Sequence, residues 1–143
     1  MVKPIYVLNG PNLNLLGTRE PDIYGRDTLD DIQAALIKRA GDVSIEFRQT
    51  NSEGQLVDWV QEASAKGGAL ILNAGAYTHT SIALHDALRA CVIPVIEVHL
   101  SNPAAREAFR QTNYVAPAAK ASIAGFGARG YQFALDAALD MTG

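Results

Sequence analysis

Cysteine is almost absent from this sequence, which contains Cys91 and no other. A single cysteine cannot form a disulfide within the chain, and this usage is typical of proteins in a reducing cytoplasm. Long hydrophobic runs are missing as well, since no apolar stretch approaches the roughly 18 residues that a membrane span needs. The first residues also lack the apolar core of a secretory signal. We therefore expect a cytoplasmic protein without a membrane partner.

An excess of positive charge is also absent. Lysine and arginine number 12 against 15 aspartate and glutamate residues, which gives a net charge of -3. Nucleic-acid binders and proteins of anionic membranes need a broad cationic surface, so the charge balance excludes both classes. The length of 143 residues and the 48% hydrophobic content suit one core. We expect residues 1–143 to form a single domain that acts on a small molecule.

Short apolar runs alternate with stretches of helical periodicity along the chain. The predicted strands cover residues 5–8, 44–47, 69–72, 92–98 and 121–124. The predicted helices cover residues 29–40, 56–63, 81–90, 104–110 and 131–140, with Thr28 and Ser52 as caps of the first two. This alternation predicts an α/β fold with a doubly wound parallel sheet. Five strands at this length favour the flavodoxin-like order 2-1-3-4-5.

Polar clusters follow the first, third and fourth predicted strands. The first cluster is an unusually long connection, residues 9–27, where such a connection normally takes about 2–6 residues. The other two clusters are residues 73–81 and 97–102. In the order 2-1-3-4-5 these strands are neighbours, and ligands of open α/β sheets bind outside the carboxyl ends of the strands. The sequence therefore predicts one binding site at this edge.

Two residue pairs in these clusters suggest acid–base chemistry. Arg19 and Tyr24 share the long connection, and a guanidinium close to a phenol favours the phenolate, which is a base. Glu97 and His99 alternate along one strand and face the same side, where a carboxylate makes an imidazole a candidate general acid. Taken alone, each pair also has a purely structural interpretation, as a packed loop tyrosine and as a satisfied histidine at a strand end.

Several other chemistries lack their motifs. The glycines form no phosphate-binding pattern, and the three histidines and one cysteine have no metal-ligand spacing. The nucleophile motif G-x-S-x-G is also missing. The remaining candidates, a basic tyrosine, an acidic histidine and neutral amides, suit proton abstraction beside a carbonyl with loss of a leaving group. A hydroxylated carboxylate is the expected substrate class.

Three runs of the sequence resemble the type II 3-dehydroquinate dehydratases. They are GPNLNLLGTREPDIYG at residues 10–25, NAGAYTHTS at residues 73–81 and EVHLSN at residues 97–102. The similarity extends to REAFR, NSEGQLVD and GFGARGY, and so covers nearly the whole chain. The resemblance implies a single catalytic domain of flavodoxin-like fold that needs no cofactor. It also implies a lyase that reversibly converts 3-dehydroquinate to 3-dehydroshikimate through an enolate, by trans-dehydration.

The resemblance also implies roles for individual residues. The catalytic base falls on Tyr24, with Arg19 as the cation that favours its ionised form. The proton donor to the leaving hydroxyl falls on His99, oriented by Glu97, and Asn12 matches an asparagine that positions a water near the enolate oxygen. The implied substrate-binding residues are Asn73, His79, Asp86, Leu100, Ser101 and Arg110.

Assembly is a further implication of the resemblance. Asp86 matches an aspartate that reaches a neighbouring subunit's site, and the family forms trimers packed into a dodecamer. The expected partners are therefore the small substrate and further copies of this chain. His85 stands where the family frequently has an arginine, and this difference is expected to affect the strength of the contact between subunits. Pro103, Ala104 and Asn113, the last in place of a common serine, are expected to change the rim of the site.

Two alternatives stay open beside the lyase. One is a flavodoxin-like binding module that has kept the fold and lost the chemistry. The presence of Arg19, Tyr24 and His99 argues against it, because a decayed site should lack at least one of them. The other is a related carbon–oxygen lyase that acts on a different hydroxylated cyclic acid.

Overall fold

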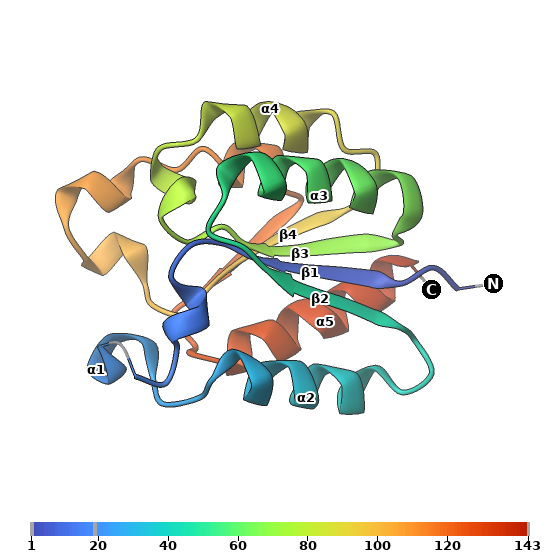
Figure 1. The fold of residues 1–143 in the computed structure, drawn as a ribbon, viewed down its shortest axis with the longest axis horizontal. Coiled ribbons are helices and arrows are strands. Elements are labelled where there is room, and N and C mark those ends of the chain that lie inside the picture. Colours follow the sequence, from blue (N-terminus) through green and yellow to red (C-terminus); the bar gives the residue numbers. More distant parts are fainter. Residues whose placement is uncertain (1, 19, 143) are drawn as a thin grey trace.

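Five parallel strands form one sheet of order β2-β1-β3-β4-β5 in the computed structural model, which describes residues 2–18 and 20–142 (Figure 1). The strands are β1 Ile5–Asn9, β2 Ile45–Gln49, β3 Ala69–Asn73, β4 Val95–His99 and β5 Ala121–Ala124. The predicted α/β class and strand order are confirmed. The fourth strand begins later than predicted, because Val92 is 84% exposed and Pro94 has no N–H to donate.

The main helices cover both faces of this sheet. They are α2 Leu29–Ala40, α3 Glu53–Lys66, α4 Ile82–Arg89 and α5 Arg129–Thr142, joined by the short α1 Pro21–Tyr24. Helices α2 and α5 lie on one face, and α3 and α4 lie on the other (Figure 1). The predicted caps are confirmed, since the Thr28 and Ser52 hydroxyls accept from the backbone N–H of Asp31 and Gln55.

The helix predicted at residues 104–110 is wrong. Two 3-10 turns stand there instead, Pro103–Ala105 and Ala108–Gln111. Between them Arg106 has extended backbone, with φ −114° and ψ −161°, and its guanidinium donates to the Ser101 hydroxyl over 3.1 Å. An extended residue cannot continue a helix, so the segment bends around the site. Further 3-10 turns are Leu13–Leu15, Gly75–His79 and Ala116–Ala118.

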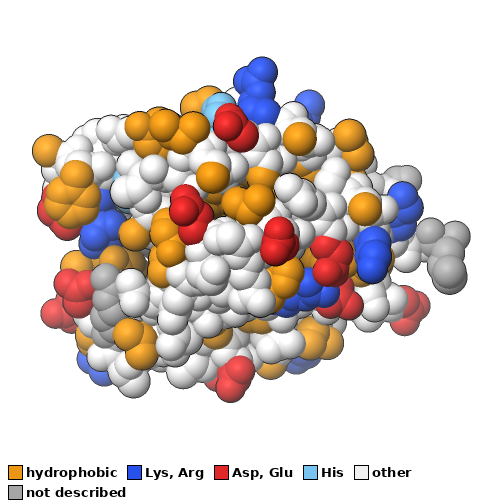
Figure 2. All heavy atoms as spheres, turned by 45° about the horizontal axis from the view of Figure 1, so that its top comes forward, with side chains coloured by type: hydrophobic (Ala, Val, Ile, Leu, Met, Phe, Trp, Pro, Cys, Tyr) orange, Lys and Arg blue, Asp and Glu red, His pale blue; other side chains and the backbone are white. Residues whose placement is uncertain are grey.

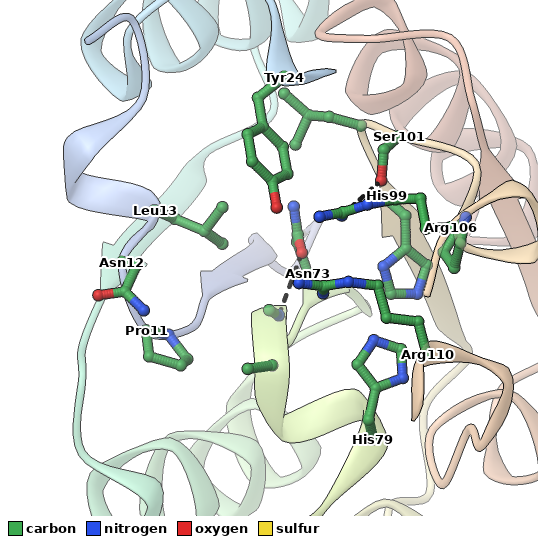
Figure 3. Close-up of a pocket in the computed structure, with 14 residues that line it drawn as sticks. Pro11, Asn12, Leu13, Tyr24, Asn73, His79, His99, Ser101, Arg106 and Arg110 are labelled. Atoms are coloured by element: carbon green, nitrogen blue, oxygen red, sulfur yellow. Dashed lines mark hydrogen bonds between the residues drawn. The ribbon is translucent and has the colours of Figure 1, made fainter. Parts of the chain in front are cut away.

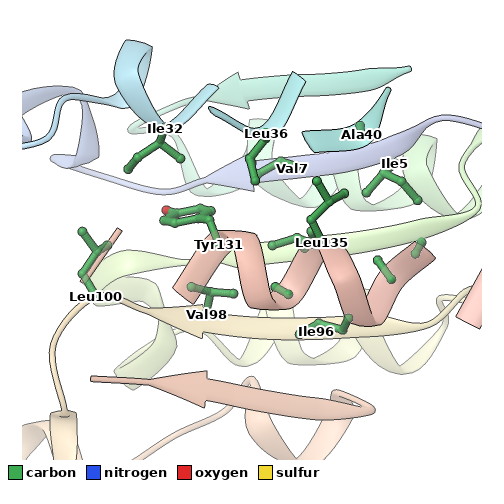
Figure 4. Close-up of a cluster of buried hydrophobic side chains, with 14 of the residues drawn as sticks. Ile5, Val7, Ile32, Leu36, Ala40, Ile96, Val98, Leu100, Tyr131 and Leu135 are labelled. Carbon is green, nitrogen blue, oxygen red and sulfur yellow. The ribbon is translucent and has the colours of Figure 1, made fainter. Parts of the chain in front are cut away.

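Alternate side chains of the strands fill two cores. In β1, Ile5 and Val7 pack toward α2 and α5, whereas Tyr6 and Leu8 pack toward α3 and α4. Figure 4 shows the first core, in which Leu135 of α5 reaches the sheet. The three central strands β1, β3 and β4 are buried along their whole length, as is usual for a parallel sheet covered by helices on both faces.

A buried hydrogen-bond chain fixes the carboxyl ends of the central strands. The Tyr131 hydroxyl of α5 donates to Asn9 Oδ1 over 2.7 Å and accepts from Asn73 Nδ2 over 2.9 Å. Burial raises the pKa of this phenol, so it stays a neutral donor. Just beyond β1, a Cβ on Gly10 would lie 2.3 Å from the carbonyl oxygen of Ala74, so only glycine fits this close approach.

Candidate active site

A cavity that opens to solvent lies at the carboxyl edge of β1, β3 and β4. Its walls come from all three predicted polar clusters (Figure 3), so their convergence is confirmed. The residues that line it are Pro11, Asn12, Leu13, Tyr24, Asn73, Gly75, Ala76, His79, His99, Leu100, Ser101, Pro103, Arg106 and Arg110.

Two residues expected at the site do not line the cavity, and a third is not described. Glu97 is buried behind His99 and is not among the described residues that line the cavity. Asp86 is exposed on α4 and is likewise outside this set of lining residues. Arg19 lies outside the described residues.

Glu97 and His99 form a buried pair at the end of β4. His99 Nε2 lies 2.7 Å from Glu97 Oε2, as their shared strand face predicts. Burial acts to raise the pKa of Glu97, but hydrogen bonds from His99, Ser122 and Asn113 outweigh it and hold that pKa below its usual value. An ionised Glu97 fixes Nε2 as the protonated ring nitrogen and stabilises an imidazolium.

The lowered pKa of Glu97 predicts how stability depends on pH. Its carboxyl binds a proton less tightly in the folded chain than in the unfolded chain, where the usual value is near 4.5. Its contribution to stability is therefore present above that value and is lost as pH falls through the folded pKa. We expect the free energy of unfolding of Glu97→Gln to fall less between pH 6 and 3 than that of the parent chain. Urea titrations along this series measure the difference, and parallel pH curves for the two proteins contradict the prediction.

Tyr24 enters the cavity from the short helix α1. Pro21 is preorganised for its first turn, and Gly25, with φ 86°, follows its last residue. The ring of Tyr24 packs against the first core, and its hydroxyl points into the cavity (Figure 3). The ring is thus held by packing while the phenol oxygen faces the cavity.

Arg106 is a site residue that the sequence reasoning missed. Its guanidinium carbon lies 5.1 Å from the centroid of the Tyr24 ring, and its Nη1 donates to Ser101 Oγ over 3.1 Å. The only signal in the sequence is its place in the REAFR run. An arginine in a predicted helix is solvated by default, and the extended backbone that turns Arg106 inward has no local signature.

Arg110 and His79 complete the basic wall of the cavity. The Arg110 Nε donates to both carboxylate oxygens of Glu107 at 3.2 Å, which directs the side chain. His79 Nδ1 lies 2.7 Å from the carbonyl oxygen of Thr112, and its ring stacks on that of His99 with centroids 6.5 Å apart. With Arg106, these groups offer several donors to an anionic ligand.

Asn12, near the start of the long connection, has a left-handed conformation with φ 69°. Asparagine tolerates this region better than most side chains. Its backbone N–H donates to Asn51 Oδ1 over 3.0 Å, and Gln49 Nε2 donates to the same oxygen over 3.1 Å. Asn12 is thus anchored to the residues that follow β2 and is held at the cavity wall.

The positions that depart from the family pattern fall in different places. Pro103 lines the cavity, and Ala104 is exposed beside it. Asn113 is not among the described residues that line the cavity, and its Nδ2 donates to Glu97 Oε2 over 2.9 Å. His85 is half-buried on α4, with Nδ1 2.7 Å from the carbonyl oxygen of Tyr114.

Two further properties bear on ligands and partners. Across residues 2–18 and 20–142, no group of three or more acidic, histidine or cysteine side chains could hold a metal ion. None of the helices in this described part has the length and apolarity to cross a membrane. On the face drawn in Figure 2, basic side chains are interspersed with acidic ones.

The comparisons with known proteins agree with one another. The family model described as "Dehydroquinase class II" matches residues 3–139. The 3-dehydroquinate dehydratase of Hyphomonas neptunium is 73% identical over 143 residues, which cover 100% of this chain and 97% of that protein. The 3-dehydroquinate dehydratase of a Caulobacter species is 59% identical, and the match covers 100% of this chain and 99% of that protein. The crystal structure of the type II dehydroquinase from Propionibacterium acnes has a TM-score of 0.91 at 45% identity and covers 98% of this chain and 99% of its own. The chain that carries this cavity therefore belongs to the class II dehydroquinase family.

Proposed function

We propose that this protein is a lyase that dehydrates 3-dehydroquinate to 3-dehydroshikimate, a step of the shikimate pathway or of quinate catabolism. One observation carries the proposal: Tyr24 and His99 line the same cavity, in a member of the class II dehydroquinases. A base and an acid that face one space can remove a proton and a hydroxyl from one bound molecule. The presence of both groups favours catalysis over simple binding.

Tyr24 removes the first proton in the proposed mechanism. As a phenolate it takes the proton from the carbon beside the substrate carbonyl, and the electron pair of that C–H bond forms an enolate. Arg106, which lies against the Tyr24 ring, stabilises the negative charge, and Arg19 is assigned the same task. Asn12 at the cavity wall holds a water near the enolate oxygen.

His99 completes the elimination. The enolate re-forms the carbonyl and expels the hydroxyl at the next carbon, while His99 gives that hydroxyl a proton, so water leaves. Because Nε2 is bound to Glu97, Nδ1 is the nitrogen left for this transfer, and the donating ring is an imidazolium. The proton on Tyr24 then returns to His99 by way of solvent, which balances the cycle.

The remaining cavity residues bind the substrate in this proposal. The substrate carboxylate lies near the backbone N–H groups of Leu100 and Ser101, close to Arg110 and His79. Asn73, which Tyr131 orients, binds a ring hydroxyl. The donor-rich wall supports this assignment, because an anion and several hydroxyl groups need such partners.

A direct assay tests the proposed reaction. Purified protein is mixed with 3-dehydroquinate, and the ultraviolet absorbance of the conjugated product is followed. We expect the absorbance to rise with time in proportion to enzyme concentration. Saturable binding without this rise contradicts the lyase and favours a binding module, and absence of both effects indicates a different hydroxylated substrate.

We also propose that the protein is a cytoplasmic homo-oligomer, with trimers packed into a dodecamer. In this assembly Asp86 reaches the cavity of a neighbouring subunit. The exposure of Asp86 on α4, away from the cavity of its own chain, supports such a role. There the Asp86 carboxylate accepts a hydrogen bond from a hydroxyl of the substrate bound to that neighbouring subunit.

Replacing Asp86 by alanine is expected to raise KM by about tenfold, because one charge-assisted hydrogen bond is lost. The oligomer should also be weaker, so that on dilution it begins to dissociate at a higher protein concentration than the parent oligomer. The acidic and basic limbs of the pH profile of kcat should stay in place. Kinetics and light scattering measure these effects. Asp58→Ala, an exposed aspartate of α3, is the matched control and should change neither. A fully active monomer contradicts the shared site.

A further inference from the structure

Asn113 lies behind the Glu97–His99 pair, in the segment that precedes the 3-10 turn Ala116–Ala118. It is half-buried and does not belong to the lining of the cavity formed by the described residues. Its side-chain Nδ2 donates to Glu97 Oε2 over 2.9 Å. This is the same carboxylate oxygen that holds His99 Nε2 at 2.7 Å. One oxygen therefore connects Asn113 to the proposed acid.

The backbone fixes which end of the Asn113 amide faces Glu97. Its Oδ1 accepts from the N–H of Val115 over 2.8 Å and from the N–H of Ala116 over 2.9 Å. Backbone N–H groups can only donate, so the oxygen end must face them and the NH₂ end must face the carboxylate. Asn113 is thus a donor to Glu97 in a single orientation.

Three donors share the Glu97 carboxylate. Asn113 and His99 bind Oε2, and the Ser122 hydroxyl of β5 donates to Oε1 over 2.6 Å. Hydrogen bonds on both oxygens hold the carboxylate in one rotamer and disperse its negative charge. The attraction that Glu97 exerts on an imidazolium therefore depends on how many donors it already serves.

We propose that Asn113 is a positioning residue that orients Glu97 and thereby sets the proton affinity of His99. The proposal rests on the proposed role of His99 as the general acid. Asn113 is not among the described residues that line this cavity, and its bond to the pair is made with Glu97, so it acts through Glu97. Its donated hydrogen bond limits the charge that Glu97 presents to His99, which keeps the imidazolium able to release its proton.

The other ionisable groups near His99 are the same in the parent chain and in variants of Asn113. Tyr24, His79, Arg106 and Arg110 line the same cavity. The strand neighbours of Glu97 are uncharged, namely Leu72 on β3 and Ser122 on β5. A change confined to Asn113 leaves all of these groups in place.

Asn113→Asp tests the proposal with little change of shape. The aspartate keeps an oxygen for the two backbone N–H groups but replaces the donor to Glu97 by a second acceptor. A new negative charge beside Glu97 should hold the His99 proton more strongly. We expect the titration midpoint of His99, followed by NMR of the three histidine rings, to rise by about one pH unit or more. The basic limb of kcat should move up with it.

Asn102→Asp is the matched control. Asn102 also caps a 3-10 turn, since its Oδ1 accepts from the N–H of Ala104 over 3.2 Å, and among the described hydrogen bonds none joins it to Glu97. The control should leave the midpoint of His99 within about 0.3 pH unit, because an exposed charge is screened by solvent. Equal midpoints in the two variants overturn the proposal.

A second variant covers the case in which Asn113→Asp does not fold. Asn113→Ala removes one of the three donors to Glu97, so the His99 midpoint should rise by a few tenths of a pH unit. An unshifted midpoint in that variant overturns the proposal. The NMR titration needs no turnover, so it distinguishes a failure of the role proposed for Asn113 from a failure of the role proposed for His99. A shifted midpoint with an unshifted kcat limb supports the role of Asn113 and contradicts His99 as the acid.

Discussion

Replacing Tyr24 by phenylalanine is expected to lower kcat by at least the 10²–10⁴-fold that general-base catalysis typically contributes, about 3–5 kcal/mol of barrier. The variant loses the only atom that removes the substrate proton in the proposed mechanism. The ring remains, so its packing on the first core and its contact with Arg106 should persist. We therefore expect KM and the thermal unfolding temperature to stay close to those of the parent chain. Steady-state kinetics and calorimetry measure the three quantities.

Tyr114→Phe is the matched control for this experiment. It removes a phenol hydroxyl outside the set of described residues that line the cavity. Its kcat should stay within about twofold of the parent value, a difference of less than 1 kcal/mol. If Tyr24→Phe kept more than about a tenth of the parent kcat, the loss would be only about 1.4 kcal/mol, and Tyr24 could not be the base.

The fold and the position of the site could be predicted from the sequence because both follow from short-range patterns. Alternating apolar strands and helical periods indicate a parallel sheet, and the strand order then brings three polar clusters to one edge. The Glu97–His99 contact follows from the two-residue period of a strand. These predictions need no knowledge of how the loops run.

The contacts that the sequence could not predict depend on loop paths. Arg106 points inward because an extended residue separates two 3-10 turns, whereas the sequence of the segment favours a helix. Asn113 lies 16 positions after Glu97, and the two 3-10 turns with their loops separate the residues, so no local period relates them. The resemblance placed Asn113 at the rim, yet its two bonds to backbone N–H groups turn it toward Glu97.

The acid half of the mechanism makes the second large prediction. His99→Asn removes the proton donor to the leaving hydroxyl, so kcat should fall by about 10²–10⁴-fold. Asn113 and Ser122 still donate to Glu97 in this variant, which should preserve the end of β4 and the fold. Single-turnover kinetics with bound substrate measure the chemical step itself. If the variant kept more than about a tenth of the parent rate, the proton would come from another group.

Glu97→Gln distinguishes the donor from the residue that supports it. His99 remains, so kcat near the acidic side of the profile should fall less than in His99→Asn. The imidazolium loses its carboxylate, however, and gives up its proton at lower pH. The basic limb of the kcat profile should therefore shift to lower pH, as a macroscopic property of the coupled site. The double variant should be no worse than His99→Asn alone, because Glu97 acts through His99 and effects within such a unit are not additive. A basic limb that stays in place in Glu97→Gln, or a double variant that is clearly slower than His99→Asn, contradicts this division of roles.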